Sequence, residues 1–159
     1  MTNKRNFLLT EFVSLLKTLD HKTKGEWGLM NPHQMVEHLT YSFMLANGKL
    51  KAEKLLSPEE NIPKLQSWLL SPKLMKENID NPLIPKTPPA PKHDNYQESI
   101  EKLYVEIQKM FEVYDQNPEV KILNPFYGDL DLEHNTNLLY KHCLHHLRQF
   151  GIQVEYVEG

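Results

Sequence analysis

The chain has 159 residues, with 18 Lys and Arg against 21 Asp and Glu, a length that fits one ordinary domain and leaves no room for a second full one. Its net charge of −3, without a basic block, excludes the electrostatic signature of a protein that binds duplex nucleic acid or an anionic membrane. The single Cys143 excludes an internal disulfide, and no apolar run approaches the ~20 residues of a membrane span. With a polar start that does not resemble a signal peptide, we expect a cytoplasmic protein whose residues 1–159 form one domain.

The first half of the chain predicts two long helices. Residues 6–20 place Phe and Leu at intervals of three and four, which is the apolar stripe of an amphipathic helix. A second helix is expected to begin after Asn31, which is a good N-cap, with Pro32 at its first position. It should end at Asn47–Gly48, because glycine accommodates the left-handed backbone that ends many helices.

A short helix and a long crossover are predicted next. Residues 57–70 indicate a short helix with a capped start, interrupted by Pro63. Residues 81–95 contain five of the eleven prolines, so this stretch should be an extended crossover without a regular element. Residues 95–114 then show the apolar stripe of another long helix.

The last long helix is expected over residues 132–150, after an irregular turn over residues 117–131. Asp131 is a suitable N-cap, and Gly151 followed by Ile152 fits a Schellman ending. Beyond it, apolar and polar residues alternate, so the tail should be extended and could pack on the helices or on a partner chain. A homodimer is therefore one possibility.

Histidines on two of the predicted helices are candidate metal ligands. His142 and His146 are four positions apart, which on a helix places them on one face, with Cβ atoms about 5–6 Å apart. Apolar neighbours flank the pair, so we expect it to face the interior, where two imidazoles can share an ion. His38 lies among apolar residues of the second helix and is the candidate third ligand, because facing helices build such sites in the core of a bundle.

Each of these observations also has a plainer interpretation. Pairs of histidines at this spacing also occur on solvated helices, and His38 alone could be a hydrogen-bonded core residue. Tyr41, one turn after His38, is a candidate catalytic proton donor, with a packed aromatic residue as the alternative. Cys143 is interpreted as an inert buried thiol rather than a nucleophile. His145 is expected on an exposed flank, or behind a ligand as a hydrogen-bond donor.

Three stretches resemble the DinB/YfiT-like proteins, in particular one poorly characterised subgroup. Residues 27–39 match the pattern W-G-x-M-x-x-x-Q-M-x-x-H-L, and residues 125–130 match P-x-x-G-x-L. Residues 142–151 match H-x-x-H-H-x-x-Q-F-G. The motifs occur in the same order and on the same predicted helices as in that subgroup, and the resemblance covers nearly the whole chain. One departure is His134, where the subgroup often has a Trp.

The resemblance implies a fold and a ligand set. The fold is an all-α four-helix bundle of the DinB type, with a long proline-rich crossover and a short extra helix. The family binds a divalent metal ion through one histidine of the second helix and the H-x₃-H pair of the fourth helix. These positions correspond to His38, His142 and His146. Related proteins include thiol-dependent S-transferases and maleylpyruvate isomerase-like enzymes.

Three neutral imidazoles would leave coordination positions open, which is typical of a catalytic rather than a structural site. Zinc and nickel both suit nitrogen ligands. We therefore predict a metal-dependent enzyme, of the thiol S-transferase or hydrolase type, in which a small thiol or water attacks a small electrophilic molecule. The alternatives are a non-catalytic metal-binding protein and a metal-free helical interaction protein. No nucleic acid or membrane partner is expected.

Overall fold

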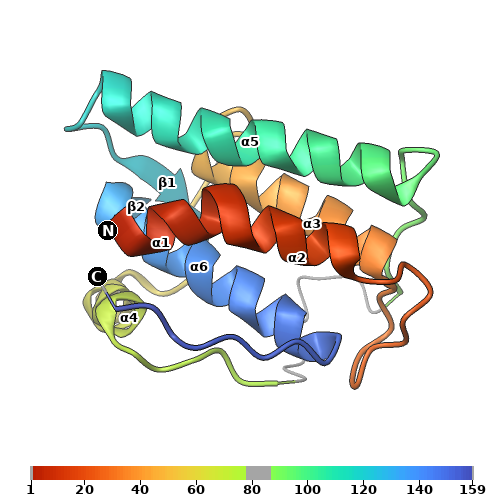
Figure 1. The fold of residues 1–159 in the computed structure, drawn as a ribbon. Helices are drawn as coiled ribbons and strands as arrows, with labels where there is room; N and C mark the ends of the chain where they lie inside the picture. Colours follow the sequence, from red (N-terminus) through yellow and green to blue (C-terminus); the bar gives the residue numbers. More distant parts are fainter. Residues whose placement is uncertain (1, 78–86, 159) are drawn as a thin grey trace.

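The computed structural model describes residues 2–77 and 87–158, and the chain is mostly helical with one small antiparallel sheet, as the all-α class predicts. In Figure 1 the long helices run beside one another, and α4 is seen nearly end-on, so it lies across them. The elements are, in chain order, α1 (Thr2–Asn6), the π-helical segment η1 (Phe7–Glu11), α2 (Phe12–Thr18), α3 (Pro32–Ala46), the 3₁₀ turn η2 (Glu59–Asn61), α4 (Ile62–Leu70), α5 (Tyr96–Gln116), β1 (Ile122–Asn124), β2 (Gly128–Leu130) and α6 (Leu132–Gln149).

The N-terminal helical region differs from the single helix predicted over residues 6–20. It begins at Thr2, ends at Thr18 and contains the π-helical segment η1. At the end of this segment the backbone N–H of Phe12 donates to the carbonyl of Phe7, five residues earlier, which is the π-helical pairing. Leu8, Phe12 and Leu16 still face one side and are fully buried, so the apolar stripe was interpreted correctly although the helix is not uniform.

Helix α3 confirms the predicted start and end. The Asn31 side chain accepts a hydrogen bond from the Gln34 backbone N–H at 2.8 Å, and the Gln34 side chain accepts one from the Asn31 N–H at 3.0 Å. This capping box satisfies two N–H groups that the first turn of a helix leaves without partners. Pro32 stands at the start of the helix, where no N–H is needed.

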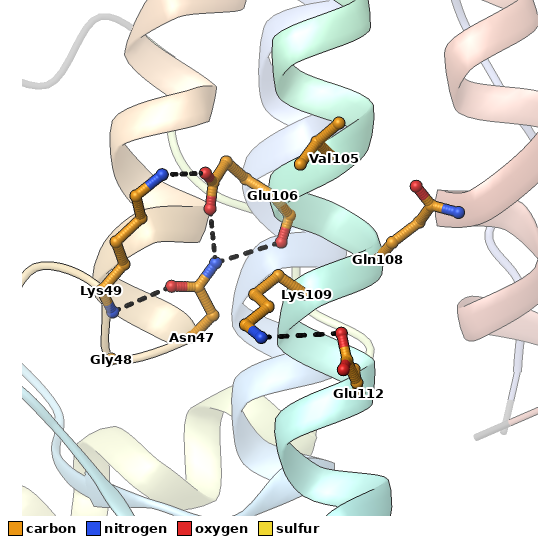
Figure 2. A pocket seen from close by; sticks show the side chains of 8 residues that line it. All are labelled: Asn47, Gly48, Lys49, Val105, Glu106, Gln108, Lys109 and Glu112. Carbon is orange, nitrogen blue, oxygen red and sulfur yellow. Dashed lines mark hydrogen bonds and ion pairs between the residues drawn. The ribbon is translucent and has the colours of Figure 1, made fainter.

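A buried polar junction joins the end of α3 to α5 (Figure 2). The Glu106 carboxylate, 6% exposed, accepts a hydrogen bond from the Asn47 side-chain amide at 2.8 Å and pairs with the Lys49 ammonium group at 2.8 Å. Because both carboxylate oxygens have partners, the buried charge is compensated. The junction helps to hold α3 and α5 side by side.

Helix α4 begins later than predicted, and Pro63 does not interrupt it. The 3₁₀ turn η2 comes first, and α4 starts at Ile62, so Pro63 lies in the first turn, where its missing N–H costs no hydrogen bond. Residues 81–86 of the predicted crossover lie outside the described residues. Residues 87–95 form neither helix nor strand. Two backbone N–H groups of this stretch, those of Lys92 and His93, donate hydrogen bonds to the Glu37 carboxylate on α3.

The stretch predicted as an irregular turn, residues 117–131, contains the hairpin of β1 and β2. Ile122 pairs with Leu130 and Asn124 with Gly128 in an antiparallel register. The Asn124 side chain accepts hydrogen bonds from the backbone N–H groups of Phe126 and Tyr127, which closes the turn. Each strand has only three residues, too few for an alternating pattern to be visible in the sequence.

Helix α6 confirms both predicted ends. The Asp131 side chain accepts from the His134 N–H at 2.9 Å. At the other end Gly151 has a φ of +80°, and the Ile152 N–H donates to the Leu147 carbonyl at 2.9 Å, as in a Schellman motif. The tail packs on its own chain, where the Val157 N–H donates to the Tyr140 hydroxyl at 2.7 Å.

The apolar faces of the long helices meet in one core. Representative buried residues are Leu8, Phe12, Met35, Leu39, Leu103, Ile107, Leu139 and Leu147. Within residues 2–77 and 87–158, no helix is both long and apolar enough to cross a membrane.

Candidate metal centre

Three histidines from α3 and α6 converge in the structure. On α3, the buried residues Met35 and Leu39 fix the rotation of the helix, so that His38 lies at the border of its buried face. On α6, Cys143 and Leu147 are fully buried, and they turn His142 and His146 toward α3. The spacing of four residues therefore places His142 and His146 on one face of α6, as predicted. The packing of α3 against α6 brings the imidazole of His38 next to them.

The ring nitrogens of this histidine cluster lie close together. The Nε2 atom of His142 is 3.0 Å from Nε2 of His38 and 3.0 Å from Nε2 of His146. One nitrogen from each ring lies within 4.8 Å of the others, so the three histidines could hold a metal ion. Two nitrogens that bind one zinc ion at about 2.0–2.1 Å each are about 3.0–3.4 Å apart, so the two separations of 3.0 Å that involve His142 fit a shared ion.

Hydrogen bonds alone do not account well for this arrangement. A neutral imidazole has one N–H and one lone pair, on different nitrogens. If Nε2 of His142 carries a proton, that single proton must serve both of its neighbours, and if it carries a lone pair, that one lone pair must accept from both. A cation at the centre would accept the lone pairs of all three nitrogens at once. The donor set thus fits a metal ion that prefers nitrogen ligands.

Burial keeps these imidazoles neutral at physiological pH. Loss of solvation lowers the pKa of His38 from 6.5 to about 4, with a further contribution from His145. Burial also lowers the pKa of His142 and His146 well below 6.5, and the neighbouring imidazoles add to the effect. The neutral form is the one that binds a metal ion, so the site does not have to lose protons before it binds.

The cluster contains imidazoles and no carboxylate among the described residues. Three neutral ligands leave the full charge of a divalent ion in place, which favours polarisation of a further ligand. His146 is 5% exposed, whereas His38 and His142 are half-buried.

Two residues around the cluster differ from their predicted environment. Tyr41 is 55% exposed, so the alternative of a packed aromatic residue is wrong. His145 is half-buried rather than exposed, and its ring centroid lies 5.6 Å from that of Trp27. Its Nδ1 atom is buried and has no hydrogen-bond partner within residues 2–77 and 87–158.

The structure confirms the interpretation of Cys143. Cys143 is fully buried, and burial raises the pKa of its thiol well above 9.0, as expected of an inert thiol. His33 lies apart from the cluster, with Nε2 2.7 Å from the Ser99 hydroxyl and 3.2 Å from the Glu37 carboxylate.

Sequence reasoning did not assign a role to Gln149. Its Oε1 atom is 2.8 Å from Nδ1 of His146, on the side of the ring that faces away from the cluster. The sequence signal for this contact is the spacing of three residues between His146 and Gln149, because side chains three positions apart on a helix are neighbours. Metal-binding histidines usually make such a hydrogen bond with their second nitrogen.

A surface cavity lies beside the junction of α3 and α5, more than two helical turns from His38 along α3. It has a volume of about 660 Å³, and Val105 is its exposed apolar residue (Figure 2). Its charged residues are paired within it, Lys49 with Glu106 and Lys109 with Glu112. The cavity therefore offers no unpaired charge to a ligand and contributes nothing to the histidine cluster.

The candidate site is thus defined by its own geometry: three neutral imidazoles, from two helices, with nitrogens close enough to hold a metal ion. Comparisons with protein-family models, with curated proteins and with solved structures found no match for this chain.

Proposed function

We propose that His38, His142 and His146 bind a divalent metal ion, zinc or nickel, and that the protein is a metal-dependent enzyme of the thiol S-transferase or hydrolase type. The observation that carries this proposal is the convergence of three Nε2 atoms, with two separations of 3.0 Å. The low pKa values of the three imidazoles and the hydrogen bond behind His146 support it.

The proposed site is open. Zinc in catalytic sites has three protein ligands and leaves a further position for water or substrate, whereas structural zinc is surrounded by four protein ligands. With three imidazoles in the described cluster, at least one position would be available to a small thiol or to water. When bound, the ion would lower the pKa of that ligand and so supply a nucleophile at neutral pH.

The resemblance to the DinB/YfiT-like proteins supports the same proposal. Under it, the chain is a single domain whose four bundle helices are the α1–α2 region, α3, α5 and α6, and its substrate is a small electrophilic molecule. The burial of the histidines excludes bulk solvent from much of the site, which strengthens the interaction of the ion with charge that develops on a substrate.

A non-catalytic metal-binding protein is the second candidate. The 5% exposure of His146 favours it, since deep burial of a ligand is also expected in a site that stores or scavenges a metal ion. The two candidates share the ligand set and differ in whether an exchangeable position remains on the bound ion.

Elemental analysis of protein purified without a histidine tag tests metal binding. We expect close to one equivalent of zinc or nickel in the wild type and a loss of at least tenfold in affinity for His142→Ala. His21→Ala, in an exposed loop, is the matched control and should bind as the wild type does. A wild-type protein that binds no divalent metal ion contradicts the proposal.

Catalysis is tested with the metal-loaded protein and a panel of electrophilic small molecules, with and without a small thiol. Turnover that a chelator removes and zinc or nickel restores supports an enzyme. Stoichiometric metal without turnover of any member, together with no exchangeable water on the ion, supports the second candidate instead.

A further inference from the structure

We infer that Gln149 is a positioning residue that fixes the tautomer of His146, and that the loop containing Trp27 and Gly28 holds Gln149 in this role. The inference deepens the proposed metal site, on which its consequence for metal affinity rests. Its first part, the position of the proton on the His146 ring, concerns the protein without metal and can be tested by itself.

The orientation of the Gln149 amide follows from its neighbours. The side chain is buried, at 4% exposure, and one end of its amide lies 3.1 Å from the main-chain carbonyl oxygen of Trp27. A carbonyl oxygen only accepts hydrogen bonds, so the atom that faces it must be the NH₂ group. The other end of the amide, Oε1, therefore faces Nδ1 of His146 at 2.8 Å. The reverse orientation would bring two oxygens into contact.

This orientation determines where the His146 proton lies. Since Oε1 of Gln149 is an acceptor, Nδ1 of His146 must donate, and it carries the single proton of the neutral ring. Nε2 of His146 then has a lone pair, directed toward Nε2 of His142 at 3.0 Å. Free histidine exchanges between two tautomers, so a fixed tautomer prepares Nε2 of His146 as a metal ligand before any ion arrives.

The loop before α3 packs tightly against Gln149. The Glu26 backbone N–H donates to the Gln149 carbonyl at 2.7 Å, so the loop is bound to the end of α6 through both main chain and side chain. Gly28 has a φ of +73°, and a Cβ atom at this position would lie 2.8 Å from Nε2 of Gln149. Any other residue would therefore push against the amide that holds His146, in addition to straining the backbone.

The tautomer is read directly from the ¹⁵N chemical shifts of the imidazole rings, by NMR on the full chain in the presence of a chelator. In the wild type we expect His146 to be protonated at Nδ1 alone. In Gln149→Leu the acceptor is lost, and the shifts should move toward a mixture of tautomers. Gln149→Glu loses the donor to the Trp27 carbonyl but keeps an acceptor toward Nδ1 of His146, so it should keep the Nδ1 proton. A wild-type His146 protonated at Nε2, or a Gln149→Leu protein with an unchanged tautomer, overturns the inference.

Zinc affinity provides a second test of the role of Gln149. Gln149→Leu should bind zinc about 10- to 100-fold more weakly than the wild type, the usual effect of removing such a partner. Gln149→Glu should stay within a few-fold of it. Gln66→Leu is the matched control, because Gln66 also holds a loop by donating to main-chain carbonyls, those of Tyr127 and Asp129, and it should bind zinc normally.

The outcomes separate this inference from the proposed function. If the wild type binds neither zinc nor nickel, the proposed function fails, and the NMR tautomer still decides whether Gln149 positions His146. If the wild type binds zinc and Gln149→Leu binds it equally well, the metal site stands and the role of Gln149 is contradicted. Gly28→Ala provides a second variant should Gln149→Leu not fold. This variant keeps all three metal ligands, and its His146 ¹⁵N chemical shifts should also move toward a mixture of tautomers.

Discussion

The Nε2 atoms of His38 and His142 lie 3.0 Å apart although the two residues are 104 positions apart in the chain. Nε2 of His146 is equally close to Nε2 of His142, so the one proton or the one lone pair on this nitrogen must serve both contacts. A bound cation would accept the lone pairs of all three rings at once, which gives the following predictions.

Zinc should stabilise the folded protein. A ligand that binds the native state at 100 times its Kd adds about 2.7 kcal/mol to the free energy of unfolding. We therefore expect the Tm of the wild type to rise on addition of zinc, as measured by differential scanning calorimetry. His146→Ala should lose this rise, and His21→Ala should keep it. A Tm rise of the same size in His146→Ala would show that zinc acts elsewhere.

Without metal, the stability of the protein should fall as the pH falls below 6.5. Burial lowers the pKa of His38 from 6.5 to about 4 in the folded protein. Between these values the unfolded chain binds a proton at this position and the folded chain does not. The free energy of unfolding therefore decreases as the pH falls through this window, and the contribution of His38 levels off below about pH 4.

Urea titrations with a chelator at a series of pH values measure this dependence. His142 and His146 contribute in the same direction, because burial also lowers their pKa values well below 6.5. His38→Ala should therefore show a shallower pH dependence than the wild type over pH 4 to 6.5. Parallel curves for the two proteins would mean that His38 is not neutral and buried in the folded state.

Glu106→Gln should destabilise the junction of α3 and α5. The Glu106 carboxylate accepts hydrogen bonds from both Asn47 and Lys49, and an amide would direct a donor at one of them. We expect a loss of about 1–3 kcal/mol in the free energy of unfolding. Glu112→Gln is the matched control, since the Glu112 pair with Lys109 is exposed and 3.7 Å long, and it should cost less than about 1 kcal/mol. Equal losses in the two variants would contradict this account.

Asn31→Ala should destabilise the protein by about 1 kcal/mol, because it removes the N-cap of α3 and half of the capping box. Asn31→Asp keeps an acceptor for the Gln34 N–H and should be close to the wild type. Chemical denaturation at pH 7 measures both. An Asn31→Ala protein as stable as the wild type would show that the box contributes nothing to α3.

Local signals were sufficient to predict much of the fold. The ends of α3 and α6 are specified by neighbouring residues: Asn31 and Pro32 at one start, Asp131 at the other, and Gly151 at the last stop. Each of these residues acts within one helical turn, so its effect is visible in a short window of sequence.

Three parts of the fold differ from the prediction, each for its own physical reason. The π-helical pairing of Phe12 with Phe7 is selected by packing and leaves no mark in residue type. The hairpin of β1 and β2 has strands too short for a period to emerge. Pro63 was interpreted as an interruption because the start of α4 was placed too early.

The candidate site could be predicted only in part, because only one contact among its three histidines is local in the sequence. The helical period places His142 and His146 together without any knowledge of the rest of the chain. The approach of His38 depends on how α3 packs on α6, and the sequence supplied only its position on an apolar face. The contact between Gln149 and Trp27 joins residues 122 positions apart, and no local pattern predicts it.

X-ray absorption spectroscopy of the zinc-loaded protein at the metal edge tests the central claim most directly. The account predicts one zinc ion with three imidazole nitrogens at about 2.0–2.1 Å and at least one further light-atom ligand. His142→Ala should lose one imidazole from that spectrum, or bind no zinc at all. A zinc ion with fewer than two imidazoles, or a wild-type spectrum identical to that of His142→Ala, would contradict it.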